Sequence, residues 1–246
     1  MIFFTSSWDD GAIYDMKLSE LLIKHNHRAT FYIPLNNIEK RSVITPSQIR
    51  ELSKYFEIGA HTMNHIYLNT IPNEEAKWEI EQSKKELELI TGNTVFGFCF
   101  PGGKFKQVHI DMVAQAGFHY ARAAKMFYIK NTNSFILGTT LQAYDHSKFI
   151  YYKNLLKNFN VKGFLEFNID VFSNDRKWDN MLSSIVEKQL ANDSDKKITI
   201  IHLWGHSWEI EEHNQWLRLE NFLKLINSHQ IRTKTNYEIS NSILIK

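Results

Sequence analysis

The sequence predicts an α/β fold in which short strands alternate with helices along one parallel sheet. Short apolar runs recur along the 246 residues, and most are followed by a longer segment of helical periodicity. Hydrophobic residues make up 43% and charged residues 23%, the balance of a globular protein with a sizeable core. Alternation of this kind implies right-handed crossovers, and about six to eight units fit a (β/α) barrel or an open doubly wound sheet.

The first half of the chain has apolar runs that we interpret as strands over 2–7, 28–34, 56–61, 94–100 and 118–123. Between them, helical patterns cover 13–26, 45–55, 73–92 and 107–117. Thr45 is followed by Pro46 and Gln48, which indicates a capped helix start. Asn73 is expected to cap the helix that Gly92 ends.

The second half is less regular. We expect a strand over 134–140, helices over 147–159 and 179–192, a strand over 197–204 and one long helix over 214–230. The chain shows no linker, low-complexity segment or internal repeat, so a single domain over 1–246 is expected.

Charge and composition exclude several classes of protein. The net charge is +2, and no basic stretch interleaved with aromatic residues indicates a nucleic-acid surface. Cys99 is the single cysteine, so an intramolecular disulfide is impossible. No window reaches the roughly 18 apolar residues of a membrane span, and the apolar run at 2–4 is too short for a signal peptide. We therefore expect a cytoplasmic protein, and the oligomeric state is left open.

Polar side chains gather where the predicted strands end, which is where both architectures place active residues. The first strand ends in Asp9-Asp10-Gly11, and the third leads into "HTMNH", residues 61–65. The fourth leads into "FPGG", residues 100–103, and the fifth carries Arg122. The strand before the last long helix leads into "HLWGHSWE", residues 202–209.

Each of these pieces has a structural interpretation when it is taken alone. Asp-Asp-Gly is commonly a polar turn, and Pro101-Gly102-Gly103 is most simply a loop, although glycine also lets the backbone approach a substrate. On a helical turn, His61 and His65 would lie about 5–6 Å apart, close enough for one metal ion. His202 and His206 begin inside a strand, where about 13 Å would separate them. We therefore interpret His206 as a rim residue and His202 as structural.

Together the pieces predict a hydrolytic metal site. Two histidines and one carboxylate hold a metal with positions left open for water and substrate. A second carboxylate beside the first can act as a base on that water, and the metal's charge relieves their repulsion. Asp9 and Asp10 supply both functions from one strand end. His206 is placed to protonate a leaving amine, and Arg122, in a buried strand, needs a carboxylate partner.

These residues resemble the polysaccharide deacetylase family, which carries the NodB homology domain (carbohydrate esterase family 4). Its first motif, an apolar strand ending in Asp-Asp-Gly, is matched by "TSSWDDG". Its second, His-Ser/Thr-x-x-His, is matched by "HTMNH", and its third and last are matched in part by "CFPGG" and "LWGHS". The motifs occur in the family's order from residue 5 to about residue 209, so the resemblance covers most of the chain.

The resemblance implies a distorted (β/α) barrel of about seven units. It also implies one divalent metal, usually zinc, and removal of an N- or O-acetyl group from a sugar. The partner would be an acetylated amino sugar, a glycan or a sugar conjugate. Carried over by motif, the general base is Asp9, the metal ligands are Asp10, His61 and His65, and the general acid is His206. Thr62 would support the second metal ligand through its hydroxyl.

The chain departs from the family pattern at several positions. The arginine of the third motif falls at Cys99, and we hypothesise that Arg122 on the next strand orients Asp9 instead. The fourth motif, Asp-x-x-Asp-Trp, is not found, but "AYDHSK" places His146, after Asp145, at a loop that can line the pocket. The backbone of Pro101-Gly102-Gly103 and the ring of Trp204, with Trp208 nearby, are candidates for contact with a sugar.

Three functions remain open at this point. The leading hypothesis is a metal-dependent N-deacetylase of an amino sugar, for which the absence of an export signal favours a small intracellular sugar, a sugar–lipid or a sugar nucleotide. The second is an amidohydrolase that acts on a small non-carbohydrate amide. The third is a non-catalytic barrel that binds glycan, which the missing third-motif arginine keeps open.

Overall fold

A computed structural model describes residues 1–130, 133–157, 177–191 and 198–244. Its sheet has the strand order β5-β4-β3-β2-β1-β7-β6, with β8 paired to β1 off this path. All pairings between these strands are parallel. The strands are β1 (Ile2–Asp9), β2 (Ala29–Ile33), β3 (Glu57–Ala60), β4 (Gly97–Cys99), β5 (Tyr120–Arg122), β6 (Leu141–Gln142), β7 (Thr199–Gly205) and β8 (Arg232–Thr233).

The two edges of this sheet meet through the segment that precedes β6. The backbone N–H of Leu137 donates to the carbonyl of Ala121 in β5, at 2.9 Å. Three residues later, the N–H of Thr140 donates to the carbonyl of His202 in β7, at 2.8 Å. The segment thus lies between β5 and β7 and curls the sheet into a distorted barrel. The predicted barrel of about seven units is confirmed, and the open doubly wound sheet is excluded.

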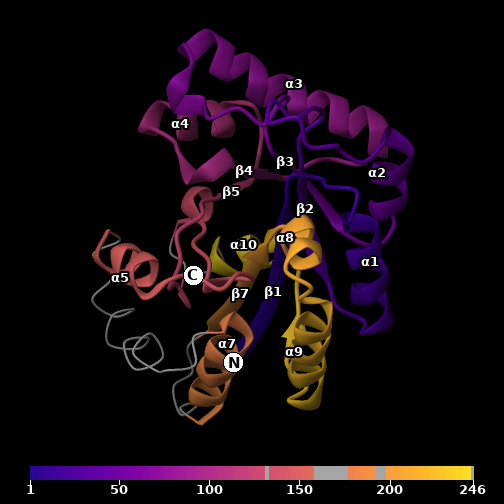
Figure 1. Ribbon diagram of the computed structural model, residues 1–246. Helices are drawn as coiled ribbons and strands as arrows, with labels where there is room; N and C mark the ends of the chain where they lie inside the picture. The colour runs from indigo at the N-terminus through magenta and orange to yellow at the C-terminus, as the bar shows by residue number, and fades with distance from the viewer. Residues whose placement is uncertain (131–132, 158–176, 192–197, 245–246) are drawn as a thin grey trace.

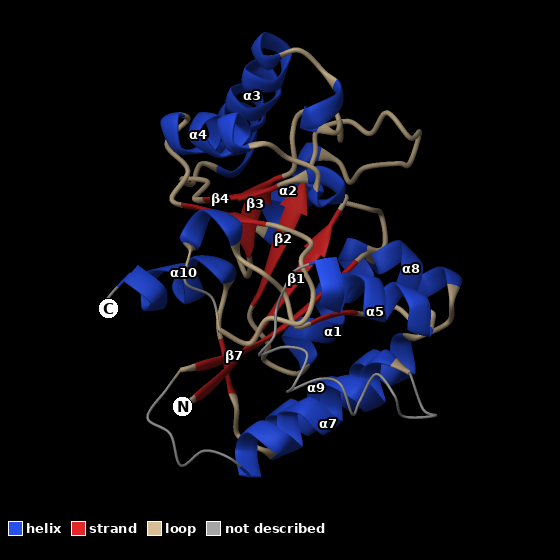
Figure 2. Cartoon of the chain, turned by 90° about the vertical axis from the view of Figure 1, so that its left-hand side faces the viewer, coloured by secondary structure: helices blue, strands red, loops and turns tan. Residues whose placement is uncertain are grey.

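Most helices lie around the outside of the sheet, whereas the C-terminal helix, α10 (Asn236–Leu244), faces the interior, where Asn236 bonds Thr5 of β1 (Figure 1). In Figure 2 the strands run through the middle of the molecule, with α3 and α4 at one end and α7 and α9 at the other. The helices are α1 (Asp15–Lys24), α2 (Pro46–Leu52), α3 (Asn73–Thr91), α4 (Gln107–Gln115), α5 (Lys148–Lys157), α7 (Trp178–Ala191), α8 (Ser207–Glu212), α9 (Trp216–Ser228) and α10 (Asn236–Leu244). Among the described residues, no helix combines the length and the apolar character that crossing a membrane requires.

Most predicted elements of the first half are confirmed, with ends shifted by a few residues. The side chain of Thr45 accepts the N–H of Gln48 and caps α2 as expected. Asn73 does not cap α3, because Pro72 is the N-cap residue and Asn73 is already the first residue of the helix. Gly92 ends α3 in the left-handed conformation, with φ of 69°.

The second half differs more from the prediction. The strand expected over 134–140 is a 3-10 turn, Ser134–Ile136, before the two-residue β6. The helix expected over 214–230 is found as Trp216–Ser228, two residues shorter at each end, whereas α8, β8 and α10 were not predicted. The sequence patterns were misleading because a one-turn or two-residue element is too short to show a period. Residues 158–159, 192 and 197 of the other predicted elements lie outside the described residues.

The face of β1 that lines the barrel interior is polar from Thr5 onward, which decides where the site lies. Alternate residues of a strand face opposite sides of a sheet, and partners in register face the same side. On β1, Phe4 and Trp8 face the apolar core under the helices, whereas Thr5, Ser7 and Asp9 face the interior. The interior partners of these three residues on other elements are Asn236, His202 and Arg122, respectively. Polar side chains therefore lead through the barrel to Asp9 at the carboxyl end of β1.

Candidate active site

The carboxyl end of β1 places two aspartates in different environments. Asp9 is the last residue of the strand and faces the interior. Asp10 and Gly11 follow in the left-handed region, with φ of 77° and 59°, so the chain turns away and Asp10 reaches the rim. A Cβ on Gly11 would lie 2.8 Å from Cγ2 of Ile33, which explains the glycine there. One strand end thus supplies two carboxylates with different partners.

Asp10, His61 and His65 come together as predicted. Oδ1 of Asp10 lies 3.0 Å from Nε2 of His65 and 3.7 Å from Nε2 of His61. All three residues are buried, and one candidate ligand atom from each lies within 4.8 Å of the others. The predicted helical turn is wrong, because residues 61–65 form an irregular loop with Thr62 and His65 at positive φ. The two rings nevertheless lie 5.1 Å apart.

The protonation of these three side chains decides how readily they can bind a metal ion. Nδ1 of His61 must donate to the carbonyl of Cys99, at 2.8 Å, so the lone pair lies on Nε2, toward Asp10. Burial lowers the pKa of His61 to about 4, which keeps the ring neutral at neutral pH. Burial raises the pKa of Asp10, but the hydrogen bond to His65 and the nearby histidines outweigh it and hold this pKa well below its usual range. Burial lowers the pKa of His65, but the hydrogen bond to Asp10 and the nearby carboxylates outweigh it and raise this pKa, so a divalent ion would displace a proton from this ring. With both imidazoles neutral, the three side chains are a fitting donor set for zinc or a similar divalent ion.

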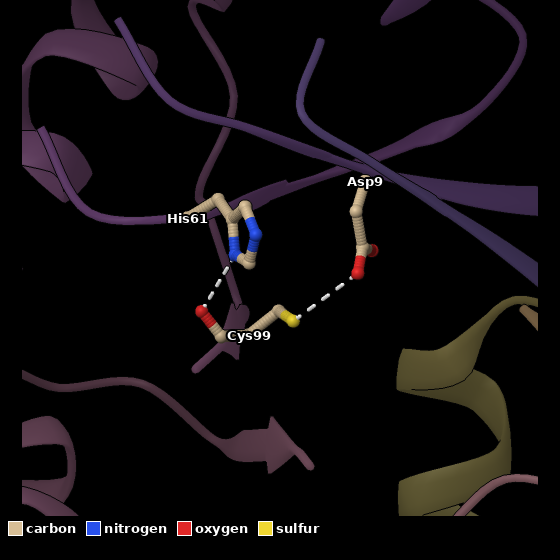
Figure 3. Close-up of side chains that lie close together, drawn as sticks. All are labelled: Asp9, His61 and Cys99. Carbon is tan, nitrogen blue, oxygen red and sulfur yellow. Dashed lines mark hydrogen bonds between the residues drawn. The ribbon is translucent and has the colours of Figure 1, made fainter. Parts of the chain in front are cut away.

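Asp9 is held from two neighbouring strands rather than one. Nη2 of Arg122, on β5, donates to Oδ1 of Asp9, and both side chains are buried. Figure 3 shows the other oxygen, Oδ2, facing the thiol of Cys99 on β4, with Sγ at 3.8 Å, and His61 beside them. Burial raises the pKa of Cys99 well above its usual value, so the thiol stays protonated and can donate. Arg122 also lies over the ring of Trp204, 5.0 Å from its centroid.

His206 faces Asp10 from the far side of the site. It follows β7, and its Nε2 lies 3.8 Å from Oδ2 of Asp10. Its Nδ1 donates to Oε2 of Glu209, at 2.7 Å. Burial lowers the pKa of His206, but the hydrogen bond to Glu209 and the charges of Asp10 and Glu209 outweigh it and raise this pKa to about 9. The imidazole is therefore protonated at neutral pH, as a general acid requires.

His146 is connected to this histidine by two side chains. Its Nε2 lies 2.8 Å from Oε1 of Gln142, and Nε2 of Gln142 donates to Oε2 of Glu209, at 3.0 Å. Asp145 faces elsewhere, with both its carboxylate oxygens bonded to Arg218 of α9. The structure therefore places His146 behind His206, at the end of a hydrogen-bonded chain, and Asp145 between helices.

The residues predicted to contact a substrate differ in how accessible they are. Trp204 is only 8% exposed, and its ring packs on Arg122 and His206. Trp208 is the ring at the site: it stacks on His206, and its Nε1 donates to Oδ2 of Asp10, at 3.0 Å. Pro101 is buried, whereas Gly102 is exposed and leaves room for the ring of Tyr67, which a Cβ would meet at 2.9 Å.

Gly103 makes a similar close approach, since a Cβ there would lie 3.1 Å from the Cβ of Ala124. His202 is buried in the barrel, with Nε2 at 2.8 Å from Oγ of Ser7, which agrees with its interpretation as structural. The sequence interpretation did not identify Glu209. Its position three residues after His206 at a helix start was the available signal.

Comparison with known proteins points to one family. Residues 3–121 match the family described as polysaccharide deacetylase. A curated relative, the peptidoglycan-N-acetylglucosamine deacetylase of Bacillus cereus, is 26% identical over 114 residues, which are 46% of this chain and 52% of the relative. The chain thus spans about half the length of that relative. The predicted resemblance to the family is confirmed.

Two solved structures show the fold over almost the whole chain. One is a family 4 acetyl xylan esterase from Clostridium thermocellum in complex with a cobalt ion, with a TM-score of 0.59 and 14% identity, covering 97% of this chain and 89% of that one. The other is a family 4 carbohydrate esterase from Streptomyces lividans in complex with acetate, with a TM-score of 0.56 and 12% identity, covering 94% and 91%.

Proposed function

From a chain whose residues 3–121 match the polysaccharide deacetylases, we propose a metal-dependent hydrolase that removes the acetyl group from an N-acetylated amino sugar of a glycan or sugar conjugate. One observation carries the proposal: a buried Asp10–His61–His65 ligand set lies between a carboxylate, Asp9, and a protonated imidazole, His206. The cobalt ion in the Clostridium thermocellum esterase and the substrate named for the Bacillus cereus relative support it.

The residues divide the chemistry by position. A divalent metal, most suitably zinc, held by Asp10, His61 and His65 would supply Lewis acidity to the acetyl carbonyl and the attacking water. Asp9 takes the proton of that water at Oδ2, because Arg122 occupies Oδ1, whereas the long 3.8 Å contact of Oδ2 with the Cys99 thiol uses only one of its lone pairs. His206 gives the proton at Nε2 to the leaving nitrogen, while Glu209 holds Nδ1.

The first test is elemental analysis of the wild-type protein and of His65→Ala purified beside it. About one divalent ion per chain is expected in the wild type and none in the variant. Without metal in the wild type, even after incubation with zinc, the proposal fails.

The second test is acetate release from acetylated chitooligosaccharides, peptidoglycan, acetylated xylan and small non-sugar amides. Asp9→Asn is expected to keep the metal and lose about 100- to 10,000-fold in kcat. Release from the small amides alone would favour the amidohydrolase, and metal binding without turnover would favour a glycan-binding barrel. The cytoplasmic location stays a prediction.

A further inference from the structure

The loop that carries both histidine ligands has a strained backbone conformation that the loop's own hydrogen bonds do not stabilise sufficiently. Thr62 and His65 have φ of 63° and 55°, and such left-handed residues other than glycine each cost about 1 kcal/mol or more. The hydroxyl of Thr62 accepts the N–H of Ile66 at 3.1 Å, which closes one turn. Contacts from outside the loop are needed to keep His61 and His65 facing one point.

Glu79 of α3 supplies one side of that support. Its side chain is buried, with the residue 2% exposed, although it is a carboxylate in the middle of a helix. Oε2 accepts the backbone N–H groups of Met63 at 2.8 Å and Asn64 at 2.9 Å. Oε1 accepts Nδ2 of Asn64 at 2.6 Å. Three donors thus compensate the cost of burying this carboxylate, and all three belong to the two residues between Thr62 and His65.

The segment after β2 supplies the other side. The carbonyl of Met63 accepts the N–H groups of Leu35 at 3.0 Å and Asn36 at 2.9 Å, and the carbonyl of Asn64 accepts the N–H of Ile38 at 3.1 Å. Met63 and Asn64 are therefore bonded through their N–H groups to α3 and through their carbonyls to the 35–38 segment.

We propose that Glu79 is a positioning residue for the metal centre: by holding the N–H groups of Met63 and Asn64, it sets the separation and orientation of His61 and His65. Glu79 lies 14 residues beyond the second histidine in the sequence and touches neither ring in any contact described above. The inference rests on the proposed metal site and identifies a residue outside the family's motifs as quoted above.

The test uses full-length protein stripped with a chelator, in the wild type, Glu79→Ala, Glu79→Gln and Glu81→Ala. Glu81, two residues along α3, has a side chain 51% exposed and serves as the matched control. Co²⁺ affinity is measured by competition with a chromogenic chelator, the geometry of the site by the visible spectrum of bound Co²⁺, and the fold by thermal unfolding of the metal-free form.

Glu79→Ala is expected to weaken Co²⁺ binding about 10- to 100-fold and to change the Co²⁺ spectrum. Glu79→Gln is expected to stay within about fivefold, because an amide oxygen still accepts both N–H groups but makes weaker hydrogen bonds. Glu81→Ala is expected to match the wild type in both measurements.

Wild-type affinity and spectrum in folded Glu79→Ala would overturn the inference while leaving the proposed function intact. Absence of Co²⁺ and Zn²⁺ binding by the wild type would instead overturn the proposed function. If Glu79→Ala does not fold, Glu79→Asp replaces it. This side chain keeps the charge but is too short to reach both N–H groups, and unchanged affinity there would overturn the inference equally.

Discussion

Glu209 decides which nitrogen of His206 is left facing Asp10 and how strongly that nitrogen holds its proton. The carboxylate accepts from Nδ1 and thereby leaves Nε2, toward Asp10, as the acidic position. Because Glu209 also contributes to the raised pKa of about 9, His206 keeps its proton across the neutral range. Gln142 and His146 stand behind Glu209 and fix its orientation.

Replacing Glu209 by glutamine is expected to move the alkaline limb of the pH–activity profile to lower pH by about one to two units. A general acid works only while it is protonated, so activity falls as the pH rises through its pKa, and loss of the negative charge lowers that pKa. The measurement is kcat/KM against pH. Glu211→Gln, on the same helix but bonded to Lys17 and Trp216, is the control. An unmoved alkaline limb would rule out Glu209 as the partner that tunes His206.

At the scale of elements, β4 and β5 act as a pair in holding Asp9, the proposed base. Cys99 and Arg122 are register partners on these strands, so their side chains emerge on the same face of the sheet. The guanidinium that the family's third motif places at position 99 comes here from position 122, one strand away. We therefore propose that strand pairing compensates for the departure seen in the sequence.

The exchange Cys99→Arg with Arg122→Cys is expected to keep the site working. Arg122→Cys alone leaves Asp9 buried without its cation, at a cost of about 3–5 kcal/mol in the free energy of unfolding. It also frees the base to move, for which about a 100-fold loss in kcat is expected. The double variant should recover most of both quantities, measured by acetate release and denaturant unfolding. Full activity of Arg122→Cys alone would show that the ion pair does not orient Asp9.

At the scale of the whole molecule, the N-terminal strands pair with, and hydrogen-bond to, elements near the C-terminus. β1 pairs with β2, β7 and β8, and Asn236 of α10 donates its N–H to Thr30 of β2. We therefore propose that the whole chain, 1–246, unfolds as one domain in a single transition. Coincident denaturant curves from far-ultraviolet circular dichroism and tryptophan fluorescence would agree with this, whereas two separated midpoints would contradict it.

The stability of the whole molecule is also expected to fall in acid through His27, which lies between β2 and α9. Burial lowers the pKa of this histidine to about 4, and its Nε2 lies 3.2 Å from the carbonyl of Leu223. The unfolded chain takes up the proton near the ordinary pKa of 6.5, so stability is complete above that pH and is lost as the pH falls toward 4. The share of His27 is about 3 kcal/mol.

Urea unfolding of the metal-free protein at about pH 7 and about pH 4.5 measures this share. In His27→Gln, whose amide cannot titrate there, the acid loss is expected to be smaller than in the wild type by about 2–3 kcal/mol. His213→Gln removes an exposed histidine and is expected to leave the acid loss unchanged. An equal loss in His27→Gln and the wild type would assign the acid sensitivity to other groups.

The sequence by itself determined the alternation of strands and helices and the set of polar residues at the strand ends. Both follow from local patterns: apolar runs, a capped start at Thr45, and short motifs that place Asp9, Asp10, His61 and His65. The sequence also suggested Arg122 as the partner of Asp9, and the two side chains form an ion pair. Tertiary structure alone decided two other pairings: Glu79 with the histidine loop, and Leu137 with β5. No local period records them, because each joins residues from separate elements that only the curled sheet brings within hydrogen-bond distance.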